Sequence, residues 1–138
     1  MNIVDRLSPN SALRPDGTMI DTLVLHYTEL PLQESLDILS DATREHRVSA
    51  HYVLAEDGMA YRLVPEERIA WHAGRSSWRG REALNGASIG FIHGGSLVPA
   101  GLAATALLPG EPTTNAPAAT SRPIKDRFVT LISATLAP

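Results

Sequence analysis

The hydrophobic pattern of the first ninety residues predicts strands and one helix. The apolar run at residues 22–25 (TLVL), which includes β-branched side chains, is typical of a strand buried on both faces. After Pro31, which is tolerated at the start of a helix, apolar side chains recur every three or four residues from Leu32 to His46. This spacing predicts an amphipathic helix over residues 32–46 that lies on a sheet.

Two further apolar runs flank a turn signal. The runs at residues 50–54 (AHYVL) and 59–64 (MAYRLV) are separated by Asp57-Gly58, and Asp-Gly between two such runs predicts a hairpin. Residues 65–87 are loop-like, and residues 88–92 (SIGFI) predict another strand. Together these elements predict a mixed α/β domain with a central β-sheet flanked by helices.

The composition changes after residue 93. Residues 1–93 contain all five histidines and most of the charged side chains. Residues 94–121 are dominated by Ala, Pro, Thr, Gly and Ser, which bury little apolar area against the entropy of ordering, and their one charged residue is Glu111. Residues 122–138 regain apolar side chains and could form a short helix. We therefore expect a partial domain over residues 1–93, an irregular low-complexity segment over 94–121 and a short helix within 122–138.

Length, charge and cysteine content narrow the class of protein. The chain has 138 residues, the size of one domain, and a net charge of -3 without a basic stripe, so nucleic acid is not an expected partner. The absence of cysteine excludes disulfides and thiolate metal sites. The sequence contains no run of about 18 apolar residues, which is the length that a membrane-spanning helix needs. No signal peptide is seen, which favours a cytoplasmic location. These features leave the oligomeric state unknown.

Histidines and large aromatic residues are the candidates for chemistry. His26 follows a buried strand, where side chains commonly emerge into a site, and a neutral imidazole is a common zinc ligand or general base. The alternative is a hydrogen-bonded histidine at a strand end. Trp71 and Trp78, with Tyr27 and Tyr52, could line a groove for sugar rings or peptides, or could simply cover the sheet. These alternatives stay open from the residues alone.

Several short motifs, taken in order, resemble a known family. They are HYT (26–28), VSAHYV (48–53), DG (57–58), LVPE (63–66), AWHAG (70–74), SWRG (77–80), Asn85 and SIG (88–90). In this order they are similar to the zinc-dependent N-acetylmuramoyl-L-alanine amidases of type 2, which are related to phage T7 lysozyme and to peptidoglycan-recognition proteins. The resemblance covers about residues 20–90.

The resemblance implies an amidase-like α/β fold and an activity. That activity is hydrolysis of the amide between N-acetylmuramic acid and L-alanine in peptidoglycan fragments or muropeptides, for cell-wall degradation or recycling. The implied cofactor is zinc, held by an early histidine that corresponds to His26 and by a histidine and an aspartate (or cysteine) near the C-terminus. Trp71, His72, Trp78 and Asn85 match the motifs around the family's substrate groove.

The resemblance stops near residue 91. The family's strand continues Ser-Ile-Gly-Ile-Glu, and its glutamate acts as the base, whereas Ile92 stands at that position here and cannot move a proton. No histidine follows His93, and Asp126 is the only later aspartate. The zinc ligand set is therefore incomplete, the catalytic residue is unknown and hydrolysis is expected to be impaired. The alternatives are a non-catalytic muropeptide-binding module and a truncated or frameshifted remnant.

Limited proteolysis tests this division of the chain. We expect subtilisin to cut first between Gly94 and Ser121, because the composition of that segment favours an irregular backbone that a protease can bind. Mass spectrometry of the earliest fragments locates the cuts. Protection of that segment, together with early cuts in the helix predicted over residues 32–46, would contradict the division.

Overall fold

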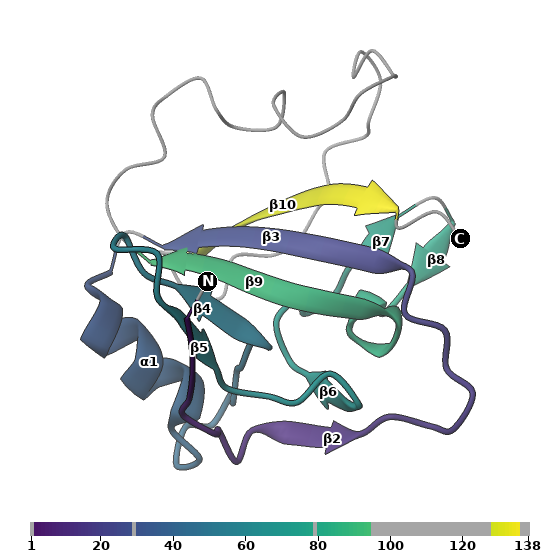
Figure 1. The fold of residues 1–138 in the computed structure, drawn as a ribbon. Coiled ribbons are helices and arrows are strands. Elements are labelled where there is room, and N and C mark those ends of the chain that lie inside the picture. Colours follow the sequence, from purple (N-terminus) through teal and green to yellow (C-terminus); the bar gives the residue numbers. More distant parts are fainter. Residues whose placement is uncertain (1, 29, 79, 95–127, 136–138) are drawn as a thin grey trace.

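A six-stranded mixed sheet forms the centre of the molecule (Figure 1). The structure, a computed structural model, describes residues 2–28, 30–78, 80–94 and 128–135. The strand order is β1-β5-β4-β9-β3-β10, and β9 runs parallel to both of its neighbours, β3 and β4. The strands of this sheet are β1 (Ile3–Asp5), β3 (Thr22–Thr28), β4 (Tyr52–Leu54), β5 (Ala60–Arg62), β9 (Ser88–Gly94) and β10 (Phe128–Thr135).

Shorter elements surround this sheet. Strands β2 and β6 form one antiparallel pair, and β7 and β8 form another. The chain passes from β3 through α1 to β4, so the helix crosses one face of the sheet between two strands that run in the same direction (Figure 1). The remaining bounds are β2 (Ser11–Leu13), α1 (Leu32–Ser40), β6 (Arg68–Ala70), β7 (Ser77–Trp78), β8 (Arg81–Glu82) and the 3-10 helix η1 (Leu84–Ala87).

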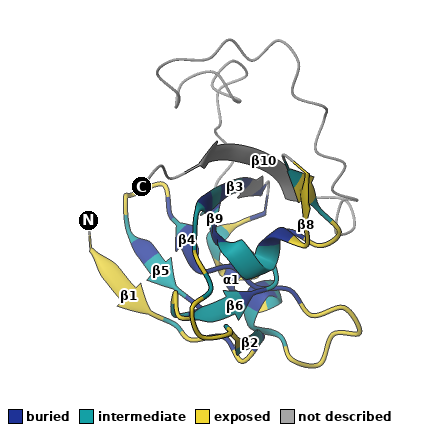
Figure 2. Cartoon of the chain, turned by 90° about the vertical axis from the view of Figure 1, so that its right-hand side faces the viewer, coloured by how far each residue is buried: buried dark blue, intermediate teal, exposed yellow. Residues whose placement is uncertain are grey.

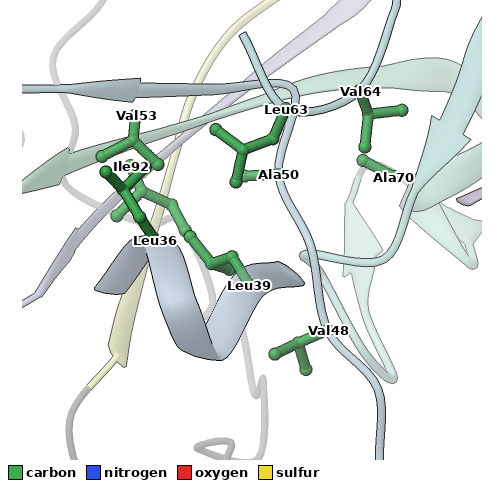
Figure 3. Close-up of a cluster of buried hydrophobic side chains, with 9 residues drawn as sticks. All are labelled: Leu36, Leu39, Val48, Ala50, Val53, Leu63, Val64, Ala70 and Ile92. Atoms are coloured by element: carbon green, nitrogen blue, oxygen red, sulfur yellow. The ribbon is translucent and has the colours of Figure 1, made fainter. Parts of the chain in front are cut away.

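The predicted mixed α/β class with a central sheet is confirmed. The apolar side of α1 packs Leu36 and Leu39 against Val53 of β4 and Ile92 of β9 (Figure 3). Burying an aliphatic side chain of this size stabilises the fold by about 1.5–3 kcal/mol. The middle of the sheet is buried, whereas β1 and β8 are exposed (Figure 2). The hydrophobic cluster contains Leu36, Leu39, Val48, Ala50, Val53, Leu63, Val64, Ala70 and Ile92.

The predicted helix over residues 32–46 is wrong at its C-terminal end. The helix ends at Ser40, and Asp41 already has an extended backbone. The Asp41 carboxylate accepts hydrogen bonds from the Thr43 backbone N–H at 2.8 Å and from its hydroxyl at 2.6 Å, which stabilises a turn. In addition, the buried Asn10 amide donates to the Asp41 carbonyl oxygen at 3.1 Å. A contact with a residue so distant in the chain leaves no periodic signal in the helix itself.

The predicted hairpin is confirmed, and the loop after it is more structured than expected. Strands β4 and β5 pair antiparallel around Asp57-Gly58, where Gly58 has a φ of 85° that favours glycine. Within residues 65–87, expected to be a loop, the structure contains β6, β7, β8 and η1. These elements are two to four residues long, too short to leave a periodic pattern.

The short helix expected within residues 122–138 is wrong over Phe128–Thr135, which forms strand β10. This strand pairs antiparallel with β3, with Leu131 opposite Leu25. Valine, threonine and isoleucine in the run favour a strand, and the edge of β3 supplies the backbone partners. Most of the segment expected to be irregular, residues 95–121, lies outside the described residues.

Residues 2–15, which we call the N-terminal arm, contain β1 and β2 and contact the end of α1. The Ser8 hydroxyl donates to the Leu39 carbonyl oxygen at 2.7 Å, and the Asn10 amide also donates to the Val48 carbonyl oxygen at 3.0 Å. At the surface, Arg6 forms an ion pair with Asp37 of the helix. The arm therefore supplies side-chain donors to buried carbonyl groups that the sheet and helix leave unpaired. Among the described residues, no helix is long and apolar enough to cross a membrane.

Candidate functional site

Three buried histidines from different parts of the chain meet beside β9. His26 lies on β3, His51 directly precedes β4, and His72 follows β6. Their exposed fractions are 4%, 0% and 5%. The ring centroids of His26 and His72 are 5.2 Å apart, and those of His51 and His72 are 5.8 Å apart. His26 thus lies against the loop that carries His72, and its ring is enclosed.

Gly90 on β9 makes room for this cluster. A Cβ atom at this position would overlap the imidazole ring of His72. On its backbone, Gly90 donates its N–H to Nδ1 of His51 at 3.0 Å and accepts the His51 N–H at 3.0 Å. Glycine inside a strand commonly marks such a close approach. The glycine therefore contacts two of the three histidines.

The hydrogen bonds of His72 show which atom is the donor at each step from His26 through His72 to Ser88. The Ser88 hydroxyl lies 2.7 Å from the Leu84 carbonyl oxygen and 3.1 Å from Nε2 of His72. A carbonyl only accepts, so the hydroxyl donates to Leu84, and Nε2–H of His72 must donate to Ser88. In a neutral ring Nδ1 then accepts, and it receives Nε2–H of His26 at 3.0 Å.

His51 has the same tautomer for an independent reason. Its Nδ1 accepts from Gly90, so its proton is on Nε2, which donates to the Arg68 carbonyl oxygen at 3.1 Å. All three rings therefore carry their proton on Nε2. This assignment follows from the direction of the hydrogen bonds rather than from observed hydrogen positions.

Burial keeps these rings neutral. Loss of solvation lowers the pKa of His26 and that of His51 to about 4. Burial, together with the neighbouring histidines and Arg14, lowers the pKa of His72 well below its usual value. Ser88 is fully buried and its hydroxyl proton is used by a carbonyl, so Ser88 and His72 do not form a serine nucleophile with its base.

The described residues do not fit a zinc ion. No group of three or more His, Cys, Asp or Glu side chains that could hold a metal occurs in the described part of the chain. The proton on Nε2 of His26 points at the lone pair of Nδ1 of His72, so neither atom offers a free lone pair. Zinc coordination through Nε2 of His26 would need this hydrogen bond to break.

Two of the predicted substrate-binding residues adjoin the cluster. The Asn85 side-chain oxygen accepts the backbone N–H groups of His72 at 3.1 Å and of Ala73 at 2.8 Å, which holds the loop in place. The Trp71 ring is half-buried, and the Arg47 guanidinium lies 5.1 Å from the centre of that ring. This distance allows a cation–π interaction.

The other aromatic candidates lie elsewhere or are packed. Trp78 is half-buried on β7, where it pairs with Arg81 of β8. Tyr52 stacks on Phe91 with ring centroids 4.8 Å apart, and its hydroxyl donates to Glu66 at 2.7 Å. The side chain of Tyr27 lies outside the described residues.

Ile92, which the sequence motifs place at the position of the family's catalytic glutamate, belongs to the core. Ile92 is 3% exposed and packs against the helix with Leu36 and Leu39 (Figure 3). The next residue, His93, points to the opposite face of the strand, and no hydrogen-bond partner of its buried Nδ1 is found among the described residues.

The sequence did not single out several residues of this site. Ser88 and Gly90 belong to a quoted motif, and glycine within a strand run was the one signal of a close approach. His51 was noted only as a strand residue, because the side chains that its ring contacts are distant in sequence. No local pattern pointed to Arg14, whose contacts are with backbone carbonyl groups.

A family model described as N-acetylmuramoyl-L-alanine amidase matches residues 16–126. The chain belongs to the N-acetylmuramoyl-L-alanine amidase family. The match includes the three histidines and runs past residue 91, where the quoted motifs end. The suspected family is therefore confirmed, and members of this family are in general zinc-dependent.

The chain is similar to parts of known amidases. N-acetylmuramoyl-L-alanine amidase AmiD of Escherichia coli (strain K12) is 42% identical over 78 residues, which are 51% of this chain and 27% of the relative. The 1,6-anhydro-N-acetylmuramyl-L-alanine amidase AmpD of Citrobacter freundii is 37% identical over 99 residues, which are 60% of this chain and 53% of the relative. The chain thus spans about a quarter to a half of these curated relatives.

A solved structure supports the fold assignment. The crystal structure of a selenomethionine derivative of AmpD matches with a TM-score of 0.61 and 32% identity. The match covers 68% of this chain and 62% of the AmpD chain. The amidase-like fold that the sequence motifs implied is therefore confirmed.

Substituting Gly90 tests the contact with His72. We expect Gly90→Ala to lower the free energy of unfolding by about 1–3 kcal/mol or more, because the added methyl group overlaps the buried ring. Gly86→Ala is the matched control, since a Cβ there meets nothing within 4 Å. Urea unfolding followed by circular dichroism measures both variants. Equal stabilities would contradict the close packing.

Acid should destabilise the fold through His51. Its pKa is lowered from 6.5 to about 4 on folding, so its contribution is complete above pH 6.5 and is lost as the pH falls toward 4. The largest possible loss from this one ring is on the order of 3 kcal/mol. We expect urea unfolding of His51→Asn, which keeps an acceptor for Gly90, to depend less on pH over this interval than that of the unaltered chain.

The exposed His46 provides the control for this measurement. At neutral pH, His46→Asn should unfold at the same urea concentration as the unaltered chain, because it leaves the buried histidines intact. An unchanged slope in His51→Asn would show that its ring is not held neutral by the fold.

Proposed function

We propose that this chain is an impaired N-acetylmuramoyl-L-alanine amidase that retains the muropeptide-binding part of the family's site. The observation that carries the proposal is the buried aliphatic side chain of Ile92, at the position that the sequence motifs give to the family's base. The proposed ligands are peptidoglycan fragments or muropeptides, in agreement with the muramyl-L-alanine amidase names of AmpD and AmiD. A cytoplasmic location is part of this proposal.

Two features support impaired hydrolysis. Catalytic zinc normally needs three protein ligands and a position left for water, and the described residues offer no such group. Amide hydrolysis also needs a group that takes a proton from the attacking water, and the family's position for this group is the aliphatic Ile92 in the core. Loss of a general base alone removes about 10²–10⁴-fold in rate.

Other features support binding. Trp71 is half-buried, so part of its ring faces solvent beside the histidine cluster, and an aromatic face suits the apolar side of a sugar ring. The exposed Arg47 lies over this ring, where its guanidinium could also pair with a carboxylate of a stem peptide. Asn85 holds the neighbouring loop by its backbone, which keeps these groups in place.

Calorimetry tests ligand binding. We expect the unaltered chain to bind an anhydro-N-acetylmuramyl peptide, and we expect Trp71→Ala to weaken the affinity about 10-fold or more because an aromatic contact is lost. Leu13→Ala is a control on the N-terminal arm, since Leu13 is 78% exposed, and it should bind like the unaltered chain. A cooperatively folded chain that binds no muropeptide would contradict the proposed binding, and a chain without cooperative unfolding would favour the remnant.

Metal content and turnover test the impairment. After dialysis against micromolar zinc, we expect less than one zinc per chain and no release of L-alanine-bearing peptides from muropeptides above that of His26→Ala. Elemental analysis and chromatography of the products measure these quantities. One zinc per chain together with turnover above this control would overturn the impairment. Binding without turnover would favour the non-catalytic module.

A further inference from the structure

The guanidinium of Arg14, on the N-terminal arm, lies among four backbone carbonyl groups. Its Nε donates to the carbonyl oxygen of Glu66 at 3.1 Å, and Nη1 donates to that of Gly86. Its Nη2 donates to the carbonyl oxygen of Arg68 at 2.9 Å and to that of Ser88 at 3.2 Å. One side chain therefore joins the arm to β6, η1 and β9, three elements that surround the histidine cluster.

Two of these carbonyl groups belong to residues that bind the histidine rings. Ser88 is held by Arg14 at its carbonyl group and accepts Nε2–H of His72 at its hydroxyl. The Arg68 carbonyl oxygen accepts both Nη2–H of Arg14 and Nε2–H of His51. Ser88 and Arg68, which accept the protons of the His72 and His51 rings, are thus both held by the guanidinium of Arg14.

The guanidinium also faces His51 directly. Nη2 of Arg14 lies 3.4 Å from Nε2 of this ring, and both atoms carry protons in the tautomer assigned above. Two donors cannot bond to each other, so each directs its proton to the Arg68 carbonyl oxygen. The fork of the guanidinium suits this task, because it reaches several acceptors in fixed directions, whereas a lysine ammonium is a point charge on a flexible stem.

We propose that Arg14 is a positioning residue for the histidine site. By holding the carbonyl groups of Arg68 and Ser88, it keeps His51 and His72 in one orientation and in the single Nε2–H tautomer. Arg14 lies before residues 16–126, which the family model matches, so the functional unit includes the N-terminal arm. The inference goes beyond the proposed function, because it concerns the protein without ligand and can be tested whether or not muropeptides bind.

Nitrogen-15 spectra of the histidine rings test this role at neutral pH. In the unaltered chain we expect the rings of His51 and His72 to show one protonated and one unprotonated nitrogen each, with the proton on Nε2. In Arg14→Lys, which keeps the charge but loses the fork, we expect the two nitrogen shifts of each ring to move toward each other or to split into two sets. A folded Arg14→Lys chain with the unaltered pattern would overturn the proposal.

Asn10→Ala separates positioning from stability. Asn10 is fully buried on the same arm, and its amide donates to the carbonyl groups of Leu39, Asp41 and Val48, none of which accepts a hydrogen bond from Arg14. We expect this variant to lower the free energy of unfolding and to leave the ring pattern unchanged. Mixed tautomers in Asn10→Ala as well would show that any loosening of the arm has the same effect, which would also overturn the specific role of Arg14.

Hydrogen exchange in the unaltered chain keeps the proposal testable if Arg14→Lys does not fold. When Arg14 holds the site, its Nη protons and the Nε2 proton of His51 become exposed in the same opening event. We therefore expect the two groups to show the same protection factor relative to the free side chains. Fast exchange of the Arg14 protons while the His51 proton stays protected would overturn the proposal.

Discussion

The close contact between the His72 ring and Gly90 is the constraint on which the site depends. The ring occupies the space that a side chain at Gly90 would fill, so β9 can carry no larger residue there. From this position His72 reaches Ser88 on one side and His26 on the other. Strand β9 thus supplies both the space for the His72 ring and the Ser88 hydroxyl that sets its tautomer. Its parallel neighbour β3 supplies His26, which donates to the same ring.

Several carbonyl groups in this molecule accept hydrogen bonds from side chains of distant segments. Unpaired polar groups in the interior cost about 1–3 kcal/mol each, so a fold with many short strands needs donors for the carbonyl groups that its sheets leave free. Asn10 supplies such donors at the end of α1, and Arg14 supplies them around the histidines. The arm is therefore part of the folded unit rather than an extension of it.

The same hydrogen bonds connect the structure to the proposed function. The family is in general zinc-dependent, yet the His26 ring bonds to His72, and the aliphatic Ile92 stands where the sequence motifs place the family's base. Trp71, which directly precedes His72, stays half-buried, and the exposed Arg47 lies over its ring. These features are the basis for proposing recognition rather than hydrolysis.

Local chemistry was enough to predict several features from the sequence. The strand that leads to His26, the hairpin at Asp57-Gly58 and the start of the helix near Pro31 each depend on neighbouring residues, and each is present in the structure. The motifs that include Trp71 and Gly90 were also sufficient to indicate the family, because their order in the chain is itself a sequence property.

The sequence alone thus determined the mixed α/β class, the main elements and the family, whereas the tertiary structure decided the helix end, the last strand and the histidine cluster. The helix stops at Ser40 because Asn10 and a local turn bind the chain there, and Phe128–Thr135 becomes a strand because it pairs with β3. His51 and Arg14 join the site through contacts with residues far along the chain. Such contacts have no periodicity and no fixed spacing, so only the packed fold could reveal them.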